Sequence, residues 1–275
     1  MNIQELIQLM INSNIEEVEA KREVKMLLEH FCNHTEKDSL LGKTLSEGDL
    51  KLLKEKIDLR INKHLPIQYI IGEAWFMGEF FKVTPDVLIP RDETEILVRK
   101  AIETINNNNF EDVLDIGTGS GCIACTIAKN TNSTVLGVDV SSDALRIALD
   151  NVTKLGINNR AIFRKSDLFE RIREGETFDL IISNPPYIPV GIELSEEVMQ
   201  EPQLALFAEE DGLYFYKKII DQAPAYLNEK GYLMFELGIN EANAVKSMME
   251  KNFKNIEIIK DLASIDRVII GQKKW

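Results

Sequence analysis

Short apolar segments alternate with helical stretches along most of this 275-residue chain, and this alternation constrains the fold more than any other feature. Each segment ends in polar or glycine residues. Such a pattern is typical of βαβ units, which form a mostly parallel sheet covered by helices on both faces. The apolar segments are residues 113–116, 135–138, 161–163, 180–182, 232–235, 256–259 and 268–270.

The chain before residue 86 has a different pattern. Apolar residues such as Leu6, Ile7 and Met10 recur at helical spacing, which predicts a small helical bundle over residues 1–66. Glycine and proline then interrupt aromatic and β-branched stretches, which predicts a hairpin linker over residues 67–85. The α/β domain follows over residues 86–275. Because a small domain beside an enzyme core often selects the partner, we expect the bundle to recognise the substrate.

Composition excludes several classes of function. The net charge is −13, whereas a duplex-binding protein carries a basic patch, so we expect no direct binding of nucleic acid. No apolar run approaches the roughly 20 residues of a membrane span, and no secretion signal is evident, so we expect a cytoplasmic protein without membrane contact. Cys122 and Cys125 form a C-x-x-C pair without a second pair, which favours helix packing over a metal site.

A glycine-rich loop follows the first apolar segment and opens a helix. Glycines allow the backbone to turn tightly and approach a ligand. Asp139 ends the next segment, where a carboxylate can accept hydrogen bonds from a ribose diol, and an adenine could lie beside the end of the third segment. Asp115, just before the loop, could reach the ammonium group of an amino acid. The expected cofactor-binding residues are Gly117, Thr118, Gly119, Ser120, Gly121, Asp139, Asp167 and Leu168.

The same loop leaves a second class of cofactor open. Gly119, Gly121 and Ala124 also fit the dinucleotide pattern G-x-G-x-x-A, and Asp139 follows at a fitting distance. A nicotinamide-dependent dehydrogenase is therefore an alternative. All histidines precede residue 66, so the larger part of the chain lacks imidazole for proton relay. This favours S-adenosyl-L-methionine over a nicotinamide.

The fourth apolar segment ends in Asn184-Pro185-Pro186-Tyr187. An amide nitrogen is a poor nucleophile because its lone pair is delocalised into the carbonyl, so a catalyst must hold and orient it. The Asn184 side-chain oxygen and the Pro185 carbonyl can each accept one N–H of a planar amide or amino group. The prolines fix that carbonyl, and Tyr187 can stack on the planar group. We therefore expect Asn184, Pro185 and Tyr187 to be catalytic, Pro186 to help bind substrate, and Asn184 to lie beside the cofactor.

These motifs together resemble those of the protein-(glutamine-N5) methyltransferase family. The resemblance covers almost the whole chain and includes residues 66–70, 72, 87–91, 93–95, 201–202, 211–213, 236–238, 260–262 and 266–267. It implies a helical bundle, a hairpin and a seven-stranded Rossmann-like class I methyltransferase domain. It also implies methyl transfer from S-adenosyl-L-methionine, leaving S-adenosyl-L-homocysteine, to the glutamine of the Gly-Gly-Gln motif in peptide chain release factors. The enzyme would then act in translation termination.

Two departures from the family pattern and three further functions stay open. Asp92 stands where proline is expected, and Ala208-Glu209 stand where glycine is expected. The same site could methylate a glutamine of a ribosomal protein, or the N6 amino group of adenine in nucleic acid. A non-enzymatic nucleotide-binding module is the third.

Overall fold

The structure is a computed structural model that describes residues 2–274, with only the backbone described at 39 and 40. Met1 and Trp275, which end the predicted domains 1–66 and 86–275, lie outside the described residues. The chain divides into two compact units. The first comprises Met1–Glu73 and Leu194–Gln200, and the second comprises Ala74–Glu193 and Glu201–Trp275.

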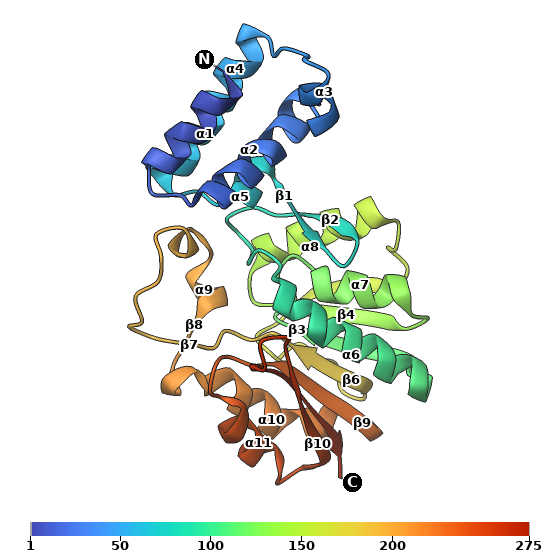
Figure 1. The fold of residues 1–275 in the computed structure, drawn as a ribbon. Helices are drawn as coiled ribbons and strands as arrows, with labels where there is room; N and C mark the ends of the chain where they lie inside the picture. Colours follow the sequence, from blue (N-terminus) through green and yellow to red (C-terminus); the bar gives the residue numbers. More distant parts are fainter. Residues whose placement is uncertain (1, 275) are drawn as a thin grey trace. The chain divides into compact units, whose positions relative to one another are not determined.

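The first unit is helical (Figure 1), with helices α1 (Ile3–Asn12), α2 (Glu17–Cys32), α3 (Glu36–Leu40), α4 (Glu47–Lys63) and α5 (Ile67–Ile71). Its core is made of apolar residues from α1, α2, α4 and α5, including Leu6, Leu27 and Leu53. The side chain of Ser46 accepts the Asp49 N–H in a capping box that starts α4. Residues 67–71 were predicted as part of a hairpin linker, but they form α5 because Ile67 and Ile70 pack into this core.

The segment Leu194–Gln200 belongs to the helical unit although it lies far away in sequence. It contains the 3-10 helix η1 (Val198–Gln200). The Glu197 carboxylate accepts a hydrogen bond of 2.8 Å from the Arg60 guanidinium, which also binds the buried Glu23 at 2.9 Å. Because a buried charge needs a partner, Arg60 ties this segment to α2 and α4.

The second unit contains a hairpin and a seven-stranded sheet. Strands β1 (Glu73–Phe76) and β2 (Glu79–Lys82) form the hairpin. The sheet has the order β10-β11-β9-β6-β3-β4-β5. Its strands are β3 (Asp112–Ile116), β4 (Thr134–Asp139), β5 (Ala161–Lys165), β6 (Phe178–Ser183), β9 (Leu227–Glu236), β10 (Phe253–Lys260) and β11 (Asp266–Lys273). Every predicted apolar segment is one of these strands.

Helices cover both faces of the sheet (Figure 1), as the sequence predicts. Adjacent residues of β3 point into different cores: Val113 packs in one cluster and Leu114 in the other. The first cluster includes α6 (Asp92–Asn108), α7 (Cys122–Asn130) and α8 (Ser142–Leu155). The second includes α10 (Tyr214–Tyr226) and α11 (Ala242–Met249). None of the helices in residues 2–274 is long and apolar enough to cross a membrane.

One strand of the sheet runs against the others. Strands β3, β4, β5, β6 and β9 pair in parallel, but β11 pairs antiparallel with both β9 and β10. The connection from β10 to β11 is residues 261–265, which is too short for the crossover that a parallel pair requires. The seven-stranded Rossmann-like sheet is confirmed, and it is mixed at one edge.

Candidate active site

A pocket with a volume of about 540 Å³ opens in the second unit, beside the carboxyl ends of β3, β4, β5 and β6. In open α/β sheets this edge is where ligands bind, since the loops that follow adjacent parallel strands meet there. Predicted residues from all four strand ends line the pocket together. They are Gly117 and Gly119 after β3, Asp139 of β4, Asp167 and Leu168 after β5, and Asn184, Pro185 and Pro186 after β6.

The glycine loop presents backbone to this pocket. Gly117 and Gly119 have φ angles of 72° and 54°, in the left-handed region that favours glycine, and both line the pocket. The N–H groups of Gly117 and Thr118 donate to the Val138 carbonyl at 2.9 and 3.0 Å. These two bonds hold the loop against the end of β4, which brings it close to Asp139.

Asp139 lies between the glycine loop and α8. Its Oδ2 accepts the Gly119 N–H at 2.9 Å, and its Oδ1 accepts the Ser141 N–H at 2.8 Å. Burial raises the pKa of Asp139, while these backbone donors oppose the rise. Each carboxylate oxygen retains a further lone pair. The side chain is thus fixed in place at the strand end, and its binding of a ribose diol stays a prediction.

Three of the predicted cofactor-binding residues, Thr118, Ser120 and Gly121, are not among those that line the pocket. Thr118 and Ser120 are buried, and Thr118 Oγ1 donates to Asp115 Oδ2 at 2.6 Å. A Cβ on Gly121 would lie 3.0 Å from Ala148 and Phe163, so this glycine permits α7 to pack closely. Contact of these residues with the cofactor stays a prediction.

Asp115 is fully buried beneath Thr118 and does not line the pocket, although its position in the sequence suggested contact with an ammonium group. Burial raises the pKa of Asp115 to about 7, and the Thr118 hydroxyl opposes this rise. Asp115 accepts the hydrogen bond from Thr118 and so holds the glycine loop in place.

One wall of the pocket was not anticipated from the sequence. It is formed by α9 (Gln203–Leu206) and by one face of α10. The pocket-lining residues of this wall are Pro202, Leu204, Ala205, Tyr214, Phe215, Lys218, Ile219 and Gln222. Tyr214, Lys218 and Gln222 recur at i, i+4 and i+8. This helical spacing could have predicted that the three residues share one face of a helix.

The Asn184–Tyr187 segment leaves the end of β6 and turns along the pocket. Asn184, Pro185 and Pro186 line it, whereas Tyr187 lies behind them, outside the set of lining residues. The Asn184 Nδ2 donates to Thr94 Oγ1 at 3.2 Å. Tyr187 OH donates to Glu236 Oε1 at 3.4 Å. Stacking of Tyr187 on a substrate therefore stays a prediction, and the structure shows its hydroxyl turned towards β9.

Two glycines from the family motifs surround Tyr187. A Cβ on Gly212 would lie 2.2 Å from the Tyr187 carbonyl oxygen, and a Cβ on Gly238 would lie 2.9 Å from the Tyr187 ring. Real Cβ contacts are never so short, so both positions require glycine for this packing. The residues 211–213 and 236–238 thus shape the back of the Asn184–Tyr187 segment.

Glu201 connects two further motifs within the same unit. Its buried carboxylate accepts the Ile89 N–H at 3.0 Å and forms an ion pair with Arg91. Val87 and Leu88, just before Ile89, line the pocket, and so does Pro202, just after Glu201. The ion pair therefore fixes two stretches of the pocket wall at once.

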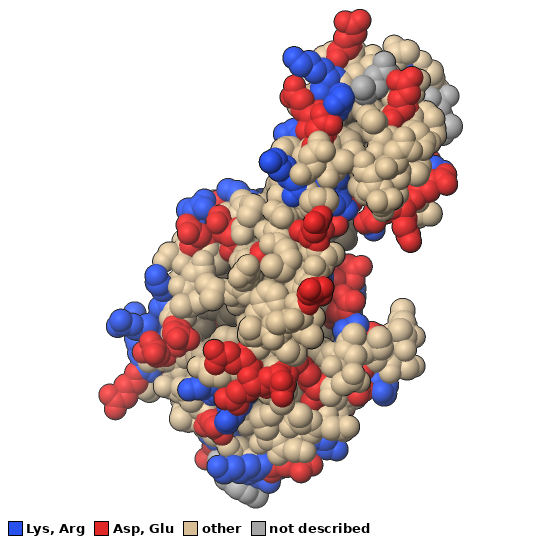
Figure 2. Space-filling model, turned by 90° about the vertical axis from the view of Figure 1, so that its left-hand side faces the viewer, with Lys and Arg blue, Asp and Glu red and all other residues tan. Residues whose placement is uncertain are grey.

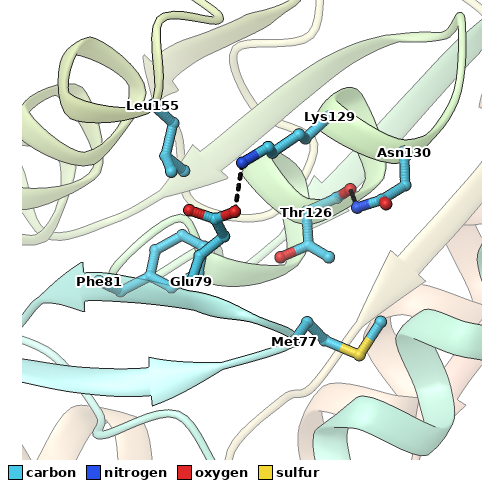
Figure 3. Close-up of a pocket in the computed structure, with 7 residues that line it drawn as sticks. All are labelled: Met77, Glu79, Phe81, Thr126, Lys129, Asn130 and Leu155. Carbon is cyan, nitrogen blue, oxygen red and sulfur yellow. Dashed lines mark hydrogen bonds and ion pairs between the residues drawn. The ribbon is translucent and has the colours of Figure 1, made fainter.

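A second, smaller cavity lies between the hairpin and α7 (Figure 3). Met77, Glu79, Phe81 and Lys129 are among its lining residues, and Lys129 forms an ion pair with Glu79. Its volume of about 50 Å³ has room for one or two water molecules. The larger pocket is therefore the candidate active site.

Charges of both signs are mixed on one face of the protein, and two of the cysteines are buried. On the face drawn in Figure 2, Lys and Arg side chains are interspersed with Asp and Glu rather than gathered into one basic surface. Cys122 and Cys125 are buried in the core against the sheet, and burial raises the pKa of both thiols. Two protonated thiols in an apolar core act as small packing residues.

The fold and this pocket define a class I methyltransferase. A family model described as a methyltransferase domain matches residues 107–275, which is more than half of the chain. Release factor glutamine methyltransferase of Fusobacterium nucleatum is 41% identical over 238 residues, which cover 85% of this chain and 67% of that protein. Its counterpart from Clostridium acetobutylicum is 40% identical over 233 residues, covering 82% and 81%. The chain belongs to the release factor glutamine methyltransferase family.

Solved structures support the fold. A 16S rRNA methyltransferase of T. thermophilus superposes with a TM-score of 0.55 at 19% sequence identity, covering 74% of this chain and 50% of that one. At this identity the likeness shows the fold alone. The family and the fold make the chain an S-adenosylmethionine-dependent methyltransferase, and the pocket fits that cofactor. It offers exposed glycine backbone, a fixed carboxylate at Asp139 and apolar walls.

Proposed function

We propose that this chain methylates the side-chain amide nitrogen (N5) of a glutamine in a peptide chain release factor, within the Gly-Gly-Gln motif. The observation that carries the proposal is the Asn184–Pro186 segment, which lines the pocket beside Asp139 and the glycine loop. Two amide acceptors beside a cofactor pocket suit a planar NH₂ group. The names of the relatives support a release factor as its source. Translation termination is a cytoplasmic process, so we propose that compartment.

In this proposal the cofactor lies against Gly117, Gly119, Asp139 and Leu168, and it supplies a methyl group on a positively charged sulfur. Asn184 Oδ1 and the Pro185 carbonyl accept the two N–H groups of the glutamine amide, which turns its nitrogen lone pair towards that methyl carbon. The amide nitrogen would gain the methyl group as the bond between that methyl and the cofactor sulfur breaks, which would leave S-adenosyl-L-homocysteine, and the nitrogen would then lose a proton to water. Because the electrophile is already activated, orientation contributes most of the rate, and no strong base is required.

We propose that the first unit recognises the substrate. The bundle over residues 1–66 and the segment Leu194–Gln200 form one compact unit. The segment follows the Asn184–Tyr187 turn in sequence. A partner that binds this unit would therefore bind residues joined by a short stretch of chain to the proposed catalytic turn, which supports the assignment.

The test uses labelled S-adenosylmethionine and four acceptors: a release factor, the same factor with its Gly-Gly-Gln glutamine changed to alanine, a ribosomal protein, and duplex DNA. We expect label in the unaltered release factor alone. Label in the ribosomal protein would assign the site to a different protein substrate. Label in DNA would assign it to adenine and would contradict the proposal.

A further inference from the structure

A chain of hydrogen bonds runs behind Asn184, away from the pocket. Asn184 Nδ2 donates to Thr94 Oγ1 at 3.2 Å, and Thr94 Oγ1 donates to Glu236 Oε2 at 2.6 Å. The second oxygen of Glu236, Oε1, accepts Tyr187 OH at 3.4 Å. The chain thus joins α6, the end of β9 and both ends of the Asn184–Tyr187 turn.

The direction of these bonds follows from the chemistry of Glu236. An ionised carboxylate can only accept hydrogen bonds, so the single hydroxyl proton of Thr94 must point at Glu236. The Thr94 oxygen is then left to accept, and the group of Asn184 that faces it must be the NH₂. Asn184 Oδ1 consequently faces the other way.

This direction matters because the two ends of an asparagine carboxamide have almost the same shape. Packing alone does not distinguish oxygen from nitrogen, and a carboxamide turned by 180° would present a donor where an acceptor is needed. A donor facing the N–H of a glutamine amide would repel it. Thr94 and Glu236 are both buried, at 2% exposure each, so water does not compete for their hydrogen bonds.

We propose that Thr94 and Glu236 are positioning residues that set the orientation of the Asn184 carboxamide, so that Oδ1 is presented to the substrate amide, and that Glu236 also holds Tyr187. This inference rests on the proposed function, because it assigns a purpose to Asn184 Oδ1. Neither residue lines the pocket, so both act through Asn184 and Tyr187.

The decisive variant is Thr94→Val, which keeps the shape of the side chain and removes its hydroxyl. We expect kcat to fall about 10- to 100-fold, as for other residues that orient a group in contact with substrate. Affinity for S-adenosylhomocysteine should stay within twofold of the parent, since Thr94 does not line the pocket. Thr94→Ser keeps the hydroxyl and should restore most of the activity.

Thr104→Val is the matched control. Thr104 is a buried threonine of the same helix, but its hydroxyl donates to the Lys100 carbonyl instead of to Glu236. It should leave kcat unchanged. Thermal unfolding of each variant checks that the comparison is made between folded proteins. A Thr94→Val protein as active as Thr104→Val would overturn the inference.

The pH profile provides a second readout. Burial raises the pKa of Glu236 to about 7, helped by Glu93, while Thr94, Arg267 and Tyr187 oppose the rise. The charge of Glu236 also contributes to the raised pKa of the Cys122 thiol on α7. A protonated Glu236 can donate a hydrogen bond and no longer enforces the direction of the chain. We therefore expect kcat of the parent to increase with pH through about 7, and Glu236→Gln to lack this increase. An identical profile in Glu236→Gln would contradict the assigned role of Glu236.

Failure of this inference is separable from failure of the proposed function. If the parent neither methylates a release factor nor binds one in the presence of S-adenosylhomocysteine, measured by isothermal titration, the proposed substrate is wrong. If the parent does both and the Thr94 and Glu236 variants match it, the substrate stands and the positioning role is wrong.

Discussion

At the scale of single residues, the side chains proposed to bind cofactor and substrate are held by different partners. Asp139 is fixed by the N–H groups of Gly119 and Ser141, next to the glycine loop. Asn184 follows a different strand and bonds to Thr94. The two side chains share no hydrogen-bond partner in the described residues, so substitutions at these sites should have separable effects.

We predict that substitution of Asn184 lowers kcat, whereas substitution of Asp139 weakens cofactor binding. Asn184→Ala removes one acceptor for the substrate amide, so kcat should fall at least about 100-fold while affinity for S-adenosylmethionine is largely kept. Asp139→Ala leaves hydroxyl groups of the cofactor unpaired and should weaken its binding by about 1–3 kcal/mol. Calorimetric titration and single-turnover rates measure the two effects. An active Asn184→Ala enzyme, or unchanged cofactor affinity in Asp139→Ala, would remove that residue from its assigned role.

Gly212 gives a second prediction at this scale. Its φ angle is 90°, and a Cβ would lie 2.2 Å from the Tyr187 carbonyl oxygen, so Gly212→Ala must displace the Asn184–Tyr187 turn. We expect activity to fall about 100-fold, the effect of a displacement of about 1 Å in an active site. Gly156→Ala is the matched control, because Gly156 has a φ angle of 69° and open space around its Cβ position. Both variants should lose about 1–2 kcal/mol of stability from the left-handed backbone. Equal activities of the two would contradict this reading of Gly212.

At the scale of secondary-structure elements, the start of α6 is a position that suits both Asp92 and the proline of the family pattern. Asp92 is the first residue of α6, and proline is expected there. The first helical position needs no N–H partner and suits proline, while an acidic residue in the first turn interacts favourably with the helix dipole. Arg91 before it has φ −107° and ψ 149°, which is also allowed before proline.

We therefore predict that Asp92→Pro is tolerated. The gain from restricting the unfolded chain, about 0.4–1 kcal/mol, offsets the loss of a dipole interaction of about 0.3–1 kcal/mol. Stability should stay within about 0.5 kcal/mol of the parent and kcat within twofold. Chemical denaturation and a rate measurement check this. A large loss of stability would mean that the Asp92 N–H or carboxylate has a structural role that its position does not indicate.

The second departure affects the loop before α10. Glu210 and Asp211 have φ angles of 52° and 55°, in the region where non-glycine residues are strained, and Gly212 follows at 90°. The glycine expected close before this loop is absent from 208–209. The loop keeps its shape through its bonds: the Gly212 and Tyr214 N–H groups both donate to the Glu209 carbonyl.

Elements differ in how well the sequence predicts them, and each difference has a physical cause. Strand positions and strand-end residues such as Asp139 and Asn184 were predictable because buried parallel strands are continuous apolar runs. The antiparallel direction of β11 follows from the short connection after Lys260, because the gap between the last two apolar segments is too short for a parallel crossover. The sequence contained this signal, but the prediction of a mostly parallel sheet did not use it. Helical spacing could have predicted that the α10 residues share one face, but it could not have placed that face against the ends of distant strands. The bond between Thr94 and Glu236 joins residues far apart in sequence, so local patterns carry no signal for it.

At the scale of the whole molecule, the second unit buries several carboxyl groups that form no ion pair within residues 2–274. Asp115, Glu236 and Glu241 are buried, and burial raises the pKa of each to about 7. Their ordinary values lie near 4. Each group therefore binds a proton more readily in the folded protein than in the unfolded chain, over the range between about 4 and 7.

This difference predicts the direction in which stability depends on pH. Because the folded state binds more protons in that range, the free energy of unfolding should fall as pH rises from about 5.5 to 7, by up to about 1.4 kcal/mol per pH unit for each group, and level off above that. The stabilising contribution is complete below the ordinary pKa and is lost as pH passes the raised one. Thermal unfolding across this range measures the slope, and Glu236→Gln, which cannot titrate, should flatten it. Stability that increases with pH over this range would contradict the raised pKa values and would indicate that these carboxylates are charged in the folded protein. Glu236 would then accept hydrogen bonds, and donate none, at every pH tested.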